Sequence, residues 1–251
     1  MANRKIKRNL YYYRWDRGYL PPSMESDRVT CSIRDFEYDT NLEDFARLRN
    51  AGVEVFACLP LLWKQEESLS PEALQPHVDG VYAGNPGQLD WARRTGRSVF
   101  GDVGLNVFNG ETVKFFAEQG LSGVTLSYEL DSDTDRLLQE LSVGDDGSLP
   151  EIEVLRYGRV PAMVSEYCPL AGAEGIKGRS CGRCMENNPV YLKGGQGERY
   201  PVLLEDSGCT SVILSKNVLQ RKNAAKGLMQ LKKGMERVCI FDETPAFAAR
   251  I

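Results

Sequence analysis

Four of the seven cysteines lie close together in a glycine-rich part of the sequence, in the order Cys168-x12-Cys181-x2-Cys184-x24-Cys209. A CxxC step lets two thiolates reach one metal centre from a single turn, and two more distant cysteines can complete a four-thiolate site. Two kinds of metal centre fit this pattern, a structural zinc ion and an iron–sulfur cluster. A four-cysteine zinc site normally uses two CxxC-type steps, and here Cys168 and Cys209 have no close partner. The asymmetry favours a [4Fe–4S] cluster over zinc.

The remaining residues offer few other kinds of chemistry. Cys31, Cys58 and Cys239 stand inside apolar strand-like runs, where we expect buried cysteines that act as small hydrophobic residues. The sequence holds one histidine, His77, so a Ser-His-Asp triad or a Cys-His pair would have to use that single loop residue. No HExxH, no P-loop and no GxGxxG after a strand is present.

Composition narrows the class of protein. The chain has 251 residues, of which 42% are hydrophobic and 26% charged, as in ordinary globular proteins. No apolar run approaches the length that crosses a bilayer, and the N-terminus lacks the apolar core of a signal peptide. We therefore expect a cytoplasmic protein with no membrane partner, in a reducing compartment where clustered cysteines indicate metal binding or redox chemistry. The net charge of −4 argues against the whole molecule being a nucleic-acid-binding surface.

Short β-rich runs alternate with helical stretches along most of the chain. Strands separated by helices indicate parallel βα units, and apolar strands without clean alternation indicate burial on both faces. The predicted fold class is α/β, a TIM-like (β/α) barrel that is complete or nearly so, with a doubly wound open sheet as the alternative. The expected strands are 28–33, 53–61, 79–84, 98–108, 123–130, 151–168 and 236–243, and the expected helices 41–52, 86–96, 110–120, 132–142 and 226–235.

Four regions follow from this pattern. Residues 28–168 form barrel units, 169–220 a Cys-rich insertion with a β-hairpin, and 221–251 the final helix and strand. Residues 1–17 carry six Lys and Arg residues against one acid, so 1–27 is expected to be a solvated arm or linker. An RNA-contacting arm, with Tyr11 to Tyr13 available for stacking, is the alternative.

Several segments resemble successive blocks of the collagenase-like peptidase U32 family. They are DVGLNVFNGETVKFFAEQGLSGVTLSYEL, RYGRVPAMVSEYCPLAG, CGRCMENNPVYLKGGQGERYPVLLEDSGCTSVILSKN and LMQLKKGMERVCIFDE, in the order that the family uses, over roughly residues 98–243. The resemblance implies a TIM-barrel-like fold and a [4Fe–4S] cluster. Cys168, Cys181, Cys184 and Cys209 match the positions of the cluster ligands.

The resemblance also implies an activity. Although the family is named for proteolysis, its better-understood members look like oxygen-independent hydroxylases of an RNA base or a ubiquinone precursor, with prephenate implicated as the hydroxyl source. A cysteine-ligated cluster suits redox chemistry better than peptide hydrolysis. We therefore expect an iron–sulfur protein that takes part in hydroxylation, with RNA favoured over a small-molecule substrate. A collagenase-like peptidase and a non-catalytic cluster-bearing subunit are the alternatives.

The chain departs from the family in two respects. The common ExFxxGAxC signature is replaced by the run from Glu153 to Pro161, with the cysteine further on. This variant resembles the second barrel-like region of long family members. Second, the chain begins where a long member would already be well advanced. It is accordingly expected to be a free-standing short form, one subunit of a heteromer with a partner from the same family, or a fragment.

Candidate site residues follow the rule that functional groups collect at the C-terminal ends of barrel strands. Arg159 is the natural clamp for an anionic cosubstrate, and Asn106 and Glu129 would orient a base edge or ring, so these three form the predicted catalytic set. The structural alternative is that Asn109 and Asp102 satisfy turns and caps and that Arg159 pairs with Glu129. The predicted substrate-binding residues are Asp102, Asn109, Tyr157 and Glu166.

Overall fold

The fold is taken from a computed structural model that describes residues 6–15, 26–63, 69–130, 133–143, 145–176, 190–205, 209–221 and 224–243. The chain divides into two compact units. The larger one comprises residues 1–60, 69–158 and 220–251, and the smaller one residues 61–68 and 159–219. Each unit is considered by itself below.

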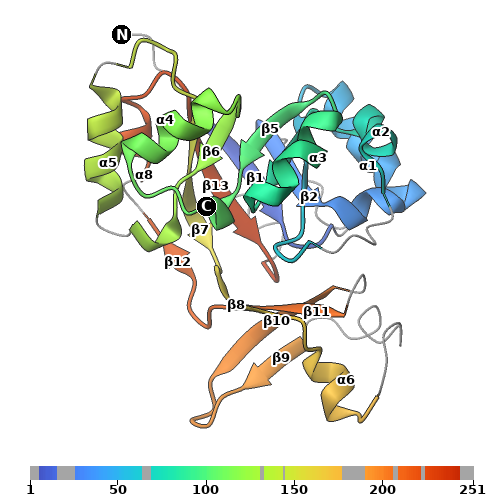
Figure 1. The fold of residues 1–251 in the computed structure, drawn as a ribbon. Helices are drawn as coiled ribbons and strands as arrows, with labels where there is room; N and C mark the ends of the chain where they lie inside the picture. Colours follow the sequence, from blue (N-terminus) through green and yellow to red (C-terminus); the bar gives the residue numbers. More distant parts are fainter. Residues whose placement is uncertain are drawn as a thin grey trace. The chain divides into compact units, whose positions relative to one another are not determined.

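The larger unit is a closed barrel (Figure 1). Within the described residues, eight strands pair in parallel around a ring, and the pairing of β6 with β7 closes it. The predicted TIM-like barrel is therefore confirmed, and the open doubly wound sheet is wrong. A short strand, β12 (Leu219–Gln220), adds to the sheet beside β7. The barrel strands are β1 (Lys7–Tyr12), β2 (Arg28–Ser32), β3 (Glu54–Cys58), β4 (Gly80–Ala83), β5 (Ser98–Gly101), β6 (Gly123–Thr125), β7 (Glu151–Gly158) and β13 (Gly234–Ile240).

Helical segments connect the barrel strands. In the described residues, one or more helical segments follow most of the barrel strands in the sequence, as expected for βα units. No helix in the described part of the chain is long and apolar enough to span a bilayer. The segments are η2 (Ile33–Glu37), α1 (Asp39–Asn50), α2 (Pro71–Leu74), η3 (Gln75–His77), η4 (Pro86–Gln88), α3 (Leu89–Arg94), η5 (Val103–Leu105), α4 (Gly110–Glu118), η6 (Tyr128–Leu130), α5 (Asp133–Ser142) and α8 (Ala224–Leu228).

The first barrel strand corrects the prediction of an N-terminal arm. Lys7–Tyr12 forms β1, which pairs in parallel with both β2 and β13. Tyr11 and Tyr12 are buried, so the alternative of an RNA-stacking arm built on them is also wrong. The basic residues of this segment suggested a solvated tail, but its inward-facing Asn9 is completely buried and hydrogen-bonded inside the barrel.

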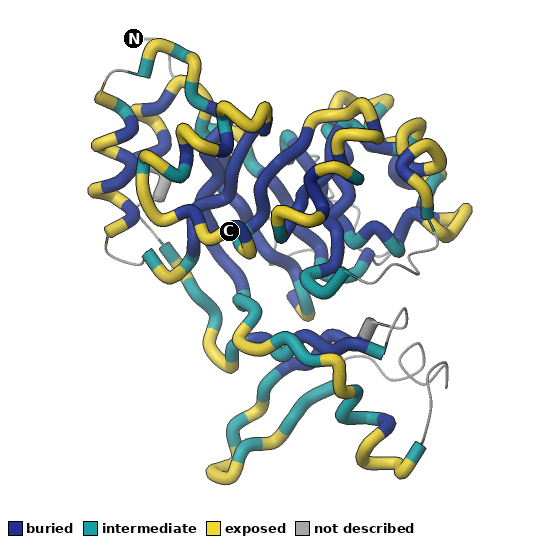
Figure 2. The backbone as a smooth tube through the Cα atoms, viewed as in Figure 1, coloured by how far each residue is buried: buried dark blue, intermediate teal, exposed yellow. Residues whose placement is uncertain are grey.

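Polar side chains reach the barrel interior from several strands. In β2, Val29 and Cys31 alternate with Arg28 and Thr30, and all four are buried (Figure 2). Asn9 and Tyr82 share a hydrogen bond although their strands are not neighbours in the sheet, so their side chains meet across the barrel interior. Branched apolar side chains more often fill such an interior, so this one is unusually polar.

Two glycines make room for aromatic rings in that interior. A Cβ atom added to Gly80 would lie 2.1 Å from the ring of Phe56, its direct partner on β3. A Cβ atom added to Gly123 would lie 2.0 Å from the ring of Phe100, its direct partner on β5. The guanidinium of Arg28 lies 4.0 Å from the centroid of the first ring and 4.3 Å from that of the second. This layer therefore holds a buried cation between two rings, an arrangement that is favourable when desolvated.

The smaller unit contains a four-stranded antiparallel sheet in the order β8-β11-β10-β9. The longer of the unit's two segments begins at Arg159, ten residues before the predicted insertion at 169, because β8 pairs with β11 instead of extending the barrel strand. The predicted β-hairpin is present as β9 and β10. The elements are β8 (Pro161–Ser165), α6 (Pro169–Ala173), β9 (Val190–Lys193), β10 (Arg199–Glu205) and β11 (Thr210–Leu214).

The ring-against-glycine contacts predict the effect of one added methyl group. Gly80→Ala should lower the free energy of unfolding by about 1–3 kcal/mol, because the Phe56 ring cannot move without disturbing Arg28. Gly195→Ala is the matched control, since its Cβ atom would meet nothing within 4 Å. It should change the free energy by less than about 0.5 kcal/mol. Urea denaturation of both variants measures the difference, and equal values would contradict the packing described here.

Candidate functional site

Arg237 forms the charged centre of the barrel interior. Its Nη1 lies 2.6 Å from Asp102 Oδ1, and its Nη2 lies 2.6 Å from Glu153 Oε2. Nη2 also donates to Thr125 Oγ1 at 2.9 Å, and the side chain is 3% exposed. Burial acts to lower the pKa of Arg237, but attraction to the two carboxylates outweighs it and leaves the pKa well above its ordinary value. The guanidinium is therefore charged and already occupied by protein partners.

Glu153 is surrounded by donors on every side. Its Oε1 accepts from Asn9 Nδ2 at 2.7 Å and from the Tyr82 hydroxyl at 2.9 Å. Its Oε2 accepts from Thr125 Oγ1 at 2.7 Å and from Arg237 Nε at 2.8 Å. A carboxylate with four donors and no exposure is structurally satisfied, so Glu153 is a scaffold residue and not a free base.

Asp102 joins this network to the C-terminal ends of the strands. Its Oδ1 accepts from Val103 N at 2.8 Å as well as from Arg237. Its Oδ2 accepts from Cys58 Sγ at 3.3 Å and from Tyr11 Oη at 3.4 Å. The last two groups also contact each other, with Cys58 Sγ 2.7 Å from Tyr11 Oη. The predicted substrate-binding residue is thus present at the expected end of the barrel, with both of its oxygens engaged.

The buried thiols at this end are protonated. Burial, followed by the charge of Asp102, raises the pKa of Cys58 well above its ordinary value. Burial likewise raises the pKa of Cys239, which hydrogen-bonds Tyr13, to about 12. Nucleophilic or metal-binding cysteines need the thiolate form. The predicted burial of Cys31, Cys58 and Cys239 is confirmed, and none of the three has the environment of a reactive thiol.

The other candidates at the strand ends have local structural roles. Asn106 ends η5 in the left-handed conformation, with φ of 51°, and is exposed. Asn109 caps α4, and its Oδ1 accepts from Thr112 N at 2.8 Å. Glu129 is exposed in η6, and its backbone N–H donates to Ser127 Oγ at 3.3 Å. Asn109 thus has the capping role that was considered as its structural alternative. Catalytic roles for Asn106 and Glu129 stay predictions.

The candidates near the end of β7 fall in both units. Tyr157 lies in β7 and is buried at 8% exposure. Arg159 lies in the smaller unit, where its Nη1 donates to the carbonyl oxygens of Ser215, at 3.1 Å, and Lys216. Glu166 is exposed in the bend after β8. The contacts of Arg159 tie together two segments of the smaller unit, and its role as an anion clamp stays a prediction.

Two of the four predicted ligand cysteines lie at one end of the small sheet. Cys209 directly precedes β11, with φ of 52°, and Cys168 caps α6, with its Sγ accepting from Ala171 N at 3.5 Å. The segments are joined because Ser211 Oγ donates to the Tyr167 carbonyl oxygen at 2.8 Å. Cys181 and Cys184 lie outside the described residues. Within the described part of the chain, no group of three His, Cys, Asp or Glu residues could hold a metal ion.

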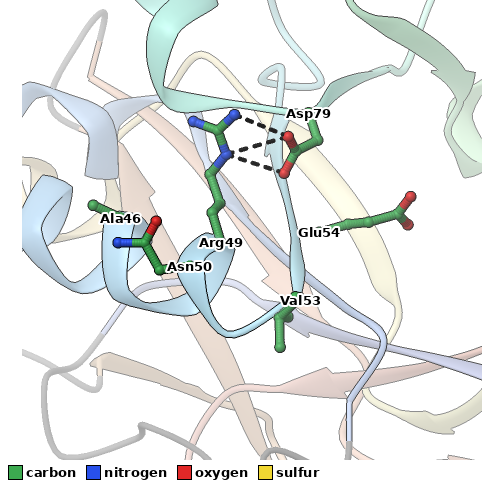
Figure 3. A pocket seen from close by; sticks show the side chains of 7 residues that line it. Ala46, Arg49, Asn50, Val53, Glu54 and Asp79 are labelled. Carbon is green, nitrogen blue, oxygen red and sulfur yellow. Dashed lines mark hydrogen bonds and ion pairs between the residues drawn. The ribbon is translucent and has the colours of Figure 1, made fainter.

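A cavity of about 530 Å³ lies at the opposite end of the barrel strands, beside the end of α1 and the start of β3 (Figure 3). Arg49 lines it and pairs with Asp79, with Nη2 3.0 Å from Oδ1. The carboxylate of Glu54 is held by Arg28 Nη2 at 2.8 Å. Because its charged groups are paired and it lies at the N-terminal ends of the strands, this cavity has no features of an active site.

Arg237, Glu153 and Tyr11 were missed as site residues in the sequence. A usable signal was present, since EIEV (151–154) and ERVC (236–239) place charged residues inside runs that otherwise predict buried strands. A charge in such a strand must face a partner, which predicts an internal ion pair. The partner itself could not be predicted, because Arg237 and Asp102 are 135 positions apart.

Removal of the central cation tests this network. Arg237→Met should lower the free energy of unfolding by about 3–5 kcal/mol, because Asp102 and Glu153 would be left buried without a cation. The control is Arg136→Met, whose side chain is 70% exposed in a surface pair with the similarly exposed Asp133 and should cost about 0–1 kcal/mol. Urea unfolding measures both, and a loss for Arg237→Met no larger than the control would contradict the assignment.

A second buried carboxyl predicts a pH dependence. Burial raises the pKa of Asp35, in η2 after β2, to about 7, although the Trp15 N–H and Arg14 act to lower it. A native pKa above the unfolded value means that the native state binds the extra proton between about pH 4 and 7, so stability falls as pH rises through this range. Asp35→Asn removes this loss. The free energy of unfolding of Asp35→Asn minus that of wild type should therefore be about 2–3 kcal/mol larger at pH 8 than at pH 5, which means that the variant gains stability relative to wild type. A pH-independent difference in urea unfolding would contradict this.

Comparison with known proteins agrees with the fold. The model of peptidase family U32 matches residues 23–232. A solved structure described as the U32 peptidase Mk0906 is 15% identical, with 98% of this chain and 97% of that chain covered and a TM-score of 0.50. The spore cortex-lytic enzyme SleL of Bacillus cereus is 8% identical over 96% of this chain and 73% of its own, with a TM-score of 0.43. No curated protein matches the chain.

These findings differ in weight. At 15% identity the likeness to Mk0906 shows the fold alone. The match to the family model covers most of the sequence and includes Cys168, Cys181, Cys184 and Cys209. The chain belongs to peptidase family U32.

Proposed function

We propose that the chain binds a [4Fe–4S] cluster and takes part in the oxygen-independent hydroxylation of an RNA base. The observation that carries the proposal is the junction of the segments bearing Cys168 and Cys209, joined through Ser211 and the Tyr167 carbonyl. A quinone precursor is the alternative substrate, and prephenate is the proposed source of the hydroxyl group. Substrate and cosubstrate rest on the family resemblance.

The donor set fits an iron–sulfur cluster. Cys168 and Cys209 are half-buried free thiols in loop positions next to regular structure. The backbone N–H of Ala171 donates to Cys168 Sγ, and such bonds stabilise thiolate sulfur and tune a cluster. These two residues, with Cys181 and Cys184, would hold the cluster, which supplies one-electron transfer when bound. Zinc remains the less favoured occupant of the same four thiols.

The barrel would contribute contacts to the substrate. Arg237 Nη1 lies 2.6 Å from Asp102 Oδ1 and holds this carboxylate in a fixed position at the C-terminal ends of the strands, where it would shape the substrate site. Asn106 and Glu129 are exposed at these ends and could hydrogen-bond a base edge. We retain Asn109, Tyr157 and Glu166 as proposed substrate contacts, and Arg159 as the proposed clamp for an anionic cosubstrate.

Peptide hydrolysis is less well supported. The single histidine, His77, ends η3 just before β4, whereas Asp102 follows β5. Because these strands are parallel, the two side chains belong to opposite ends of the barrel. A nucleophile–histidine–aspartate arrangement that uses Asp102 is therefore excluded. Cys58, the thiol beside Asp102, has no histidine and a raised pKa, which disfavours a cysteine peptidase.

The cluster assignment predicts a spectroscopic result. The full chain, purified without oxygen, should absorb as a brown iron–sulfur protein and give a reduced-state electron paramagnetic resonance signal. Cys168→Ser and Cys209→Ser should each lose most of the bound iron, since each removes one ligand. Cys31→Ala, a cysteine of the barrel, is the matched control and should retain it. A colourless wild-type protein with bound zinc would contradict the assignment of an iron–sulfur cluster.

Two further assays separate the rival functions. Casein cleavage by metal-free protein, surviving replacement of the four cysteines by alanine, would establish a peptidase instead. Mass spectrometry of RNA from a deletion strain should show a missing hydroxylated nucleoside, restored by wild type but not by Cys168→Ser. A cluster-bearing protein that is active only with a partner from the same family would identify a subunit of a heteromer.

We also propose a cytoplasmic location, because a reducing compartment keeps these thiols available.

A further inference from the structure

The β9–β10 hairpin of the smaller unit presents two cations directly opposite each other. Lys193 pairs with Arg199 in the antiparallel register, so both side chains leave the same face of the sheet. Both residues are exposed. Like charges at directly opposite positions destabilise a hairpin. The hairpin therefore carries a charge arrangement that does not serve its own folding.

An aromatic ring adjoins these cations on the same face. Tyr191 lies two residues before Lys193, and the Arg199 guanidinium lies 4.2 Å from the centroid of its ring. Neither cation forms an ion pair with a carboxylate of the described residues. The neighbouring Glu198 is engaged elsewhere, because its carboxylate accepts from Gln196 N at 3.2 Å and lies 3.9 Å from Lys216 Nζ. Tyr191, Lys193 and Arg199 thus form a cationic surface with a flat stacking group, here called the hairpin face.

We propose that the hairpin face binds single-stranded RNA, which rests on the proposed function and extends it to a named contact surface. Lys193 would neutralise a phosphate as a point charge, and Arg199 would offer both a phosphate contact and a planar surface that continues the Tyr191 ring. Unpaired bases stack on aromatic rings and on guanidinium planes, whereas bases in a duplex are not available for stacking. An acidic peptide would use the cations but would gain nothing from the stacked pair.

The tip of the hairpin leaves room for a polynucleotide backbone. Gly195 and Gly197 lie between the two strands, and a Cβ atom at either would meet nothing within 4 Å. Gly197 needs its glycine for a φ of 89°, whereas Gly195 has no such requirement. Space around Gly195 and Gly197 at the tip of the hairpin is therefore open, and a sugar–phosphate chain could approach the backbone there.

The test is the affinity of the anaerobically purified full chain for a fluorescein-labelled single-stranded RNA, by fluorescence anisotropy over a range of salt concentrations. Lys193→Gln should weaken binding about fivefold or more and reduce the slope of log Kd against log salt by about 0.7, the value for one phosphate contact on a single strand. Lys114→Gln on α4 removes the same charge from an exposed lysine of the barrel and should change neither quantity. Equal effects of the two variants would overturn the proposal.

The ring is tested separately from the charge. Tyr191→Leu keeps an apolar side chain but removes the stacking surface, so it should weaken binding about fivefold or more without changing the salt slope. Binding unaffected by this change would overturn the stacking role. A duplex or an acidic peptide bound as tightly as the single strand would overturn the choice of partner.

The visible absorption of each sample separates this proposal from the cluster assignment. Variants that keep the cluster but lose affinity for RNA support the role of the hairpin face. Variants that keep both the cluster and the affinity for RNA overturn that role and leave the cluster assignment unaffected. A colourless wild-type protein that still binds RNA through Lys193 and Tyr191 would overturn the cluster and leave the hairpin face standing. Thermal unfolding of each variant confirms that the small sheet remains folded.

Discussion

The ion pairs of Arg237 with Asp102 and Glu153 are the constraint around which the barrel is arranged. A buried guanidinium is costly unless its charge and its donors are satisfied, and here both are. The contacts reach β5 and β7 from β13 and, through Glu153, extend to Asn9 on β1 and Tyr82 on β4. The closed ring brings these strands around one interior, so closure and charge pairing depend on each other.

The same constraint limits what the barrel can do chemically. Carboxylates that are locked by a cation, and thiols held protonated by burial, are poor general bases and poor nucleophiles. This separates the buried Cys58 and Cys239 from the partly exposed Cys168 and Cys209 of the smaller unit. Of the two pairs, only the second has the partial exposure that a metal-binding or redox-active thiol requires.

Much of the architecture could be predicted from the sequence. Alternating strand and helix signals led to a TIM-like barrel, and glycine-rich, cysteine-bearing sequence marked the inserted sheet. The first strand was missed because Lys7–Tyr12 resembles a basic tail. Its burial depends on Asn9 meeting Glu153, 144 positions away, and no local pattern reports such a partner. Of the site, the buried state of three cysteines and the cap at Asn109 were predictable, whereas the network around Arg237 required the closed barrel.

We propose that four cysteines of this chain serve redox chemistry and not proteolysis. Native mass spectrometry of the anaerobically purified full chain tests it most directly, because it weighs the bound group without assuming its spectrum. We expect one species heavier than the polypeptide by four irons and four sulfides, and we expect this species to be absent when Cys168 and Cys209 are both serine. A wild-type chain carrying one zinc ion, or no added mass at all, would contradict it.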